Sequence, residues 1–308
     1  MLKVFKILIF AAFIIVIFCS LTLKASALNK IVYQRYHILY EEGDSLLAAK
    51  LAERLEEKID RIENFFGGKQ RSIVTIYITD SDEEYFKYAS RAVPEWSQAV
   101  AFPKENLVVL KLKSAEEIKN SLKILLHELV HINLANHLLS RRIPVWLNEG
   151  LAQYLSGEDF SFNDKVILSN ALLTKKIIKL QDIDSLTKFN KAKAHLAYAQ
   201  SISAVEYFIR EHGAAEFQSL IQDIPKYRSI DAAFKNFAGG DLLDFELNWY
   251  ADLRERYRWM AVLNFDNLIW VFMGFLALLA IAAVKYRNKK KLRDWEENEE
   301  FDSWELDS

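Results

Sequence analysis

Residues 127–131 read His-Glu-Leu-Val-His and residues 145–150 read Val-Trp-Leu-Asn-Glu-Gly, and these two stretches decide the fold of the middle of the chain. Apolar residues recur around both at intervals of three and four, which is the spacing of amphipathic helices. Proline is common in the first turn of a helix, and glycine is common just beyond its last turn. The sequence therefore predicts one helix over about 114–139 and a second that Pro144 opens and Gly157 ends.

The two histidines of the first stretch stand four positions apart, so His127 and His131 lie on one helix face, where both imidazoles can reach one metal ion. Glu128 then lies beside the ion, where it can take a proton from water. A catalytic zinc needs three protein ligands and one open position, and Glu149 on the following helix can supply the third ligand. Two histidines that only pack or are solvated at helical spacing are the alternative for the first stretch alone.

H-E-x-x-H followed by W-L-N-E-G-x-A over residues 146–152 resembles the gluzincin zinc metallopeptidases, most closely the peptidase MA-like family. The resemblance covers about residues 70–257. It implies a zincin-like fold and a peptidase that uses one Zn²⁺ to hydrolyse peptide or protein substrates. In this resemblance Glu128 corresponds to the general base. The zinc ligands correspond to His127, His131 and Glu149.

Further roles rest on the same resemblance. Gluzincins commonly place a Tyr or His after the third ligand to stabilise the oxyanion, and here Tyr198 is the candidate with His195 as runner-up. A half-buried aromatic on an amphipathic helix explains Tyr198 equally well. Aminopeptidases of this clan carry a G-x-M-E-N strand, which residues 97–107 lack, so the sequence favours an endopeptidase. Gln153, one turn after the third ligand, can hydrogen-bond a ligand or simply lie on the helix surface.

Substrate backbone can add to an exposed sheet edge, and residues 107–112 are the candidate unless that strand is interior. A different class of function is also compatible with the motifs: a non-catalytic zinc-binding membrane protein that acts through partner binding. The intact Glu128 argues against it, because a purely structural metal site needs no base.

The composition narrows the function further. The chain has 308 residues, of which 51% are hydrophobic, so it can bury a sizeable core. Its 40 basic residues are balanced by 42 acidic ones, which argues against nucleic acid as a partner. The single cysteine, Cys19, lies in an apolar N-terminal stretch. Any chemistry in the rest of the chain therefore depends on histidines, carboxylates, hydroxyls or a metal.

Two apolar stretches indicate how the chain meets a membrane. Residues 7–23 follow two lysines and precede Ala25-Ser26-Ala27, which is the pattern of a signal peptide over residues 1–27. An uncleaved anchor helix is the alternative. Residues 262–284 are expected to form a transmembrane helix, since residues 268–284 carry no charge.

Six basic residues between positions 285 and 293 mark the cytoplasmic side of that helix. The sequence therefore predicts a single-pass membrane protein whose domain over residues 28–258 is extracytoplasmic. Residues 285–308 form a basic-then-acidic cytoplasmic tail. The acidic composition after Arg293 predicts disorder there and a possible cytoplasmic partner.

The remaining patterns predict a fold of the α+β class: a small N-terminal β-sheet layer packed on a mainly helical C-terminal half, plus the C-terminal transmembrane helix. Ser114 and Glu117 have the spacing of a capping box at the start of the first motif helix. Strands are expected at 31–40, 73–79, 98–102 and 107–112. Further helices are expected at about 47–62, 164–177, 192–211, 214–223, 229–237 and 242–257.

Overall fold

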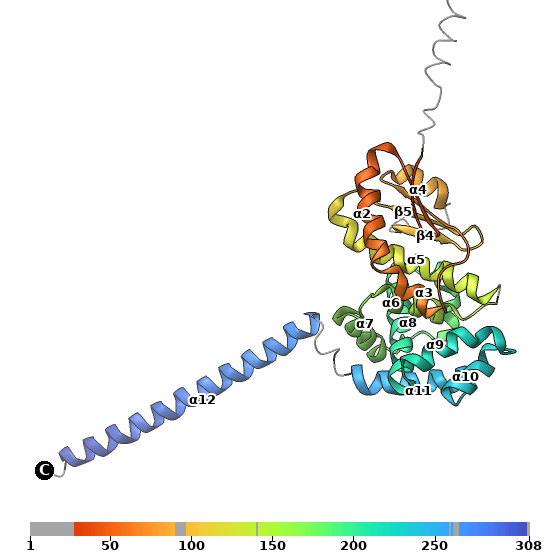
Figure 1. Cartoon of the computed structure of the whole chain (residues 1–308). Coiled ribbons are helices and arrows are strands. Elements are labelled where there is room, and N and C mark those ends of the chain that lie inside the picture. The colour runs from red at the N-terminus through yellow and green to blue at the C-terminus, as the bar shows by residue number, and fades with distance from the viewer. Residues whose placement is uncertain (1–27, 90–96, 140, 259, 261–264, 307–308) are drawn as a thin grey trace, which may run out of the picture. The chain divides into compact units, whose positions relative to one another are not determined.

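The computed structural model describes residues 28–89, 97–139, 141–258, 260 and 265–306, so the expected signal peptide over 1–27 lies outside the described residues. The α+β fold class is confirmed (Figure 1). The strands are β1 (Asn29–Tyr33), β2 (Tyr36–Tyr40), β3 (Val74–Thr79), β4 (Ala99–Phe102) and β5 (Leu107–Lys111). The α-helices are α2 (Ser45–Glu56), α3 (Ile59–Phe65), α4 (Asp82–Ala89), α5 (Ile118–Leu138), α6 (Val145–Ser156), α7 (Phe162–Leu173), α8 (Lys191–His212), α9 (Ala214–Asp223), α10 (Ile230–Ala238), α11 (Leu242–Tyr257) and α12 (Phe265–Leu306).

The strands form one mixed sheet in the order β1-β2-β3-β5-β4. β2, β3 and β5 run parallel to their neighbours in this central part, whereas β1 and β4 pair antiparallel at the two edges. Ile76 stands opposite Val108, and Val109 stands opposite Val100 of the edge strand. Of the two alternatives for residues 107–112, an exposed edge or an interior strand, the interior strand is correct, because β5 pairs with β3 on one side and with β4 on the other.

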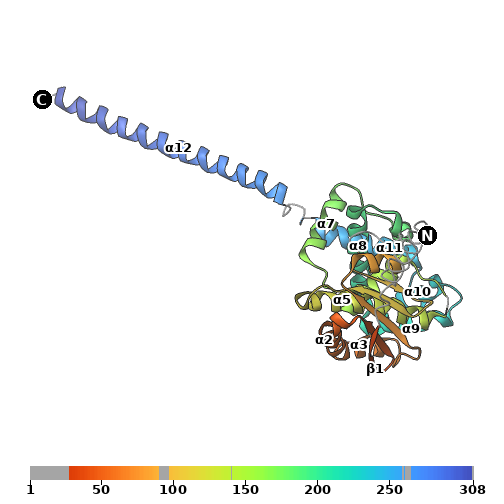
Figure 2. The same ribbon diagram turned by 90° about the horizontal axis from the view of Figure 1, so that it is seen from above.

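Helices cover both faces of the sheet, since successive strand side chains point to opposite sides. On one face, Tyr77 and Val109 form a buried cluster with Tyr85 and Ala89 of α4. Helices α2 and α5 contact each other and the strands, and they cover the opposite face (Figure 2). This sheet unit consists of residues up to Arg142 together with Leu151–Glu158 and Gln218–Tyr227.

A second compact unit contains residues Ile143–Gly150, Asp159–Phe217 and the chain from Arg228 onward. In it α8 packs against α7, α10 and α11. Trp249 of α11 is 1% exposed, and its indole Nε1 donates to Ser203 Oγ of α8 at 3.2 Å. Gln200 Nε2 donates to the Ile178 carbonyl at 2.6 Å, and its Oε1 accepts from the Ile178 amide. These bonds satisfy polar groups that burial would otherwise leave unpaired.

The last helix, α12, is long and apolar enough to cross a membrane. The most apolar 18-residue window of the segment Ile269–Arg293 has a mean hydropathy of 2.1, and none of this window is buried inside the protein. The prediction of a disordered tail after Arg293 is wrong for the described part, because α12 continues to Leu306. Glutamate is the most frequent residue of this part and is a good helix former, so the helix that the apolar segment begins can continue through it.

Three local predictions differ from the structure, and one helix was not predicted. The run over 31–40 is a hairpin rather than one strand, because Gln34 adopts a left-handed φ of 50° and reverses the chain. The helix over 47–62 divides into α2 and α3, which lets Ile59 and Ile62 become fully buried. Ser114 makes no side-chain cap, and Glu117 instead accepts from the Lys113 amide. No pattern predicted α4.

Candidate metal centre

Helix α5 carries both motif histidines on one face. Leu125, Leu129 and Ile132 are fully buried and hold the other side of the helix against the protein. The half-buried rings of His127 and His131 therefore point to a common side, with centroids 4.9 Å apart and planes at 78°. The i, i+4 spacing of the sequence produces this pair directly.

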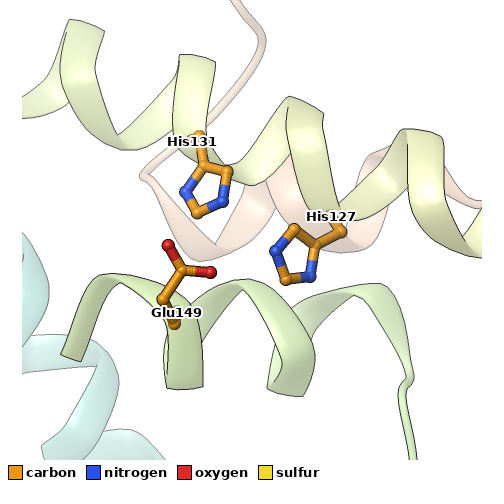
Figure 3. Close-up of side chains that lie close together, drawn as sticks. All are labelled: His127, His131 and Glu149. Carbon is orange, nitrogen blue, oxygen red and sulfur yellow. The ribbon is translucent and has the colours of Figure 1, made fainter. Parts of the chain in front are cut away.

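Glu149 of α6 completes the cluster. One nitrogen of each imidazole and a carboxylate oxygen of Glu149 all lie within 4.8 Å of one another. Figure 3 shows the carboxylate turned toward both rings. Helix α6 is unbroken from Val145 to Ser156, so Glu149 shares a helix with residues of the sheet unit that contains α5.

Tertiary contacts set the position of α6. The amide of Val145 donates to Asp184 Oδ1 at 2.9 Å, which satisfies one free donor at the start of the helix. Trp146 is 2% exposed and stacks on Phe245 with centroids 5.5 Å apart. Beside the candidate ligand, a Cβ on Gly150 would lie 2.4 Å from the carbonyl oxygen of Ser201 in α8. Glycine is therefore the residue that fits this close approach of α8.

Glu158 contacts the histidine pair, and the sequence motifs did not reveal it. Its Oε1 lies 2.8 Å from His127 Nδ1 and 3.2 Å from Ser156 Oγ, which donates to it. An ionised carboxylate only accepts hydrogen bonds, so Nδ1 of His127 carries the proton and Nε2 keeps its lone pair for a metal.

The end of α6 brings Glu158 back toward the histidine. Gly157 has a φ of 75°, the left-handed conformation that commonly ends helices, and the Glu158 amide then donates to the Gln153 carbonyl at 3.0 Å. Arg61 of α3 donates to the Tyr154 carbonyl at 3.1 Å and fixes the same turn. The sequence feature that could have revealed Glu158 is a glycine followed directly by an acidic residue at the end of the motif helix.

Glu128 occupies the position between the two histidines and is half-buried on α5. Its negative charge acts on Tyr85 of α4, whose pKa is raised mainly by burial and further by this carboxylate. Tyr85 is fully buried, and its hydroxyl lies 2.8 Å from Ser97 Oγ. A neutral phenol is therefore kept in the neighbourhood of Glu128.

The other candidates differ in their surroundings. Tyr198 is half-buried on α8, three residues before the Ser201 carbonyl that approaches Gly150, whereas His195 is exposed. The expectation that Gln153 bonds a metal ligand gains no support, because its Oε1 is buried without a hydrogen-bond partner in the described structure.

The cluster has the donor chemistry of a metal site. Two imidazole nitrogens and one carboxylate oxygen are ligands that zinc and neighbouring divalent metals prefer, and Glu158 orients one of the rings. The H-E-x-x-H helix and the glutamate of the following helix thus together supply the ligand set of a metal site. The family model of the Peptidase MA superfamily matches residues 55–255, and the chain belongs to this superfamily. No curated protein matches the chain.

Proposed function

We propose that the protein is a membrane-anchored zinc metallopeptidase that cleaves internal peptide bonds outside the cytoplasm. The observation that carries the proposal is the convergence of His127, His131 and Glu149, with ligand atoms within 4.8 Å of one another. The same helix pair also supplies a base, Glu128, and an orienting carboxylate, Glu158.

Each of these residues has a separate role in hydrolysis. Zn²⁺ held by the two histidines and Glu149 would supply a Lewis acid that polarises the scissile carbonyl and lowers the pKa of water to about 7. Glu128 takes the proton of the attacking water and passes it to the leaving amine. The peptide bond and one water molecule are thereby converted to a carboxylate and an amine. Glu158 holds the ring of His127 and its proton in place throughout.

Two further parts of the proposal concern the substrate. Tyr198 is the proposed donor to the developing oxyanion, with His195 as the alternative, and such a donor is worth about 3 kcal/mol. The edge strand β4 replaces residues 107–112 as the proposed place for substrate backbone, because among the described strands β4 pairs with β5 alone. A strand that accepts an extended chain along its length favours internal over terminal peptide bonds.

The proposed location follows from the charges around α12. Six basic residues lie between positions 285 and 293, at the end of the apolar segment, and basic residues favour the cytoplasmic side. The sheet and helical units then lie outside the cytoplasm, where protein substrates are exported or extracellular. The signal-peptide pattern over residues 1–27 agrees with this orientation.

The test is digestion of casein and of a peptide library by the full chain in detergent, with metal content measured on the same sample. We expect one zinc per chain and activity that a chelator removes and zinc restores. Glu128→Gln should keep the zinc but cleave on the order of 10²- to 10⁴-fold more slowly. Glu216→Gln, an exposed position on α9, is the control and should cleave normally.

Full activity of Glu128→Gln with zinc bound would contradict the assigned base. Two results together would favour the non-catalytic alternative. The first is a chain that binds zinc but cleaves no substrate. The second is that cells with Glu128→Gln behave like cells with the parent chain, whereas cells with His127→Ala do not.

A further inference from the structure

One face of α11 carries a stripe of apolar and basic side chains. Leu243, Leu247, Tyr250, Arg254 and Arg258 follow one another at intervals of three and four, so they share one side of the helix. Leu243 is 64% exposed and Leu247 is 60% exposed. The stripe lines one side of a groove of about 690 Å³ in the helical unit, here named the α11 groove.

The opposite side of the α11 groove is also lined by exposed leucine and basic side chains. Leu173, at the end of α7, is 52% exposed, and the exposed Lys175 and Lys179 follow it. Among the described lining residues the one acid is Glu246, whose Oε1 already accepts from the Leu180 amide at 2.8 Å. The groove therefore combines three exposed leucines with four cationic side chains, and no ion pair joins these four cations to any described residue.

The chain itself keeps this groove near a membrane. Arg258 ends the stripe, and α12 begins seven positions later at Phe265, before the apolar segment that starts at Ile269. Seven residues span at most about 25 Å when fully extended. If α12 crosses a bilayer, the end of α11 must therefore stay within that reach of the start of α12.

We propose that the α11 groove docks on the surface of the bilayer that α12 crosses, where it binds anionic phospholipid headgroups. The inference rests on the membrane insertion of α12 and not on the peptidase activity. Leucines of an amphipathic surface enter the interfacial layer while lysines and arginines meet the phosphates, and basic residues next to a span are attracted to anionic lipid. A second copy of this chain packed groove against groove is disfavoured as occupant, because the four cations of each copy would face one another. The cations that meet the phosphates are Lys175, Lys179, Arg254 and Arg258.

The test uses the full chain in lipid nanodiscs, with Cys19→Ser and one fluorescent label on Leu247→Cys. The measured quantity is quenching of the label by spin-labelled lipid. We expect quenching on the order of threefold stronger in discs with roughly 30% phosphatidylglycerol than in pure phosphatidylcholine discs. About 1 M salt, where the Debye length is about 3 Å, should remove the difference. A label on Leu46→Cys, an equally exposed leucine on α2, should show little quenching.

Charge variants separate lipid binding from simple proximity. The triple variant Lys175→Glu, Lys179→Glu and Arg254→Glu should lose the extra quenching in anionic discs. The matched triple variant Lys50→Glu, Lys69→Glu and Lys119→Glu changes the net charge equally at exposed sites outside the groove and should retain it.

Three outcomes would overturn the proposal. In the first, the label on Leu247→Cys is quenched no more than the label on Leu46→Cys. In the second, the charge reversals in the groove leave the quenching unchanged. In the third, the label on Leu247→Cys is shielded from water but not quenched by lipid, which would mean that protein covers the groove. Failure of the chain to enter discs would instead contradict the membrane span. Cleavage of a short soluble peptide should be the same in both triple variants, so loss of peptidase activity is scored separately.

Discussion

Oε1 of Glu158 lies 2.8 Å from Nδ1 of His127, although 31 positions separate the two residues in the chain. The contact fixes which ring nitrogen carries the proton and how the ring is turned. Gly157 makes it possible, because its φ of 75° reverses the chain directly after α6. The carboxylate thus acts on the metal centre through a histidine and is a positioning residue.

Replacement of the Glu158 carboxylate should mainly lower the affinity of the site for metal. We expect Glu158→Gln to lower zinc affinity about 10- to 100-fold, because the ring of His127 loses its charged acceptor. Competition with a coloured chelator measures the affinity, and Glu158→Asp should recover part of it. Asp159→Asn at the exposed neighbouring position is the control. Equal affinities in all four proteins would show that the hydrogen bond does not orient the ligand.

The close approach at Gly150 predicts a packing defect. In Gly150→Ala the new Cβ would meet the Ser201 carbonyl at 2.4 Å and Val205 Cγ2 at 2.7 Å. We expect a loss of about 1–3 kcal/mol in unfolding free energy, and a displaced Glu149 should also weaken metal binding. Gly43→Ala meets nothing within 4 Å and should leave the melting temperature nearly unchanged. If both variants have the melting temperature of the parent, the predicted steric clash at Gly150 is wrong.

The proposed oxyanion donor predicts a separation of kcat from KM. Tyr198→Phe removes only the hydroxyl, so kcat should fall about 100-fold while KM and metal content stay constant. His195→Ala is the comparison, since His195 lies exposed on the same helix. Steady-state kinetics on one peptide substrate measures both variants. A loss confined to His195→Ala would exchange the two assignments.

The half-buried Glu206 of α8 predicts a pH-dependent stability. Burial raises the pKa of its carboxyl above the ordinary 4.5, and the charges of Lys165 and Arg210 offset only part of this effect. The folded chain therefore holds the proton more tightly than the unfolded chain, so its stability falls as pH rises from about 4.5 through the folded pKa.

Glu206→Gln should accordingly melt higher than the parent at pH 8 and at the same temperature as the parent below pH of about 4. Melting temperatures recorded at both pH values measure the difference, and the exposed Glu216→Gln serves as control. A parent that is the more stable form at pH 8 would mean that the cations outweigh the burial.

Prediction from the sequence succeeded where structure depends on neighbours along the chain. The i, i+4 spacing of His127 and His131 forces both onto one face of a helix, and the apolar periodicity located α5, α6 and the helices after them. It failed where a few backbone angles decide the outcome. Gln34 turned one expected strand into a hairpin, and the break before α3 divided one expected helix.

By itself the sequence determined the α+β class, the histidine pair, the identity of the acid on the next helix and an apolar segment long enough to span a membrane. Only the tertiary structure decided that Glu149 meets the two rings, that β5 is interior with β4 at the edge, and that Glu158 holds His127. The physical reason is the separation along the chain between the residues that interact. Helical phase follows from local geometry, whereas strand order and the meeting of distant side chains depend on how separate elements bury their apolar faces against one another.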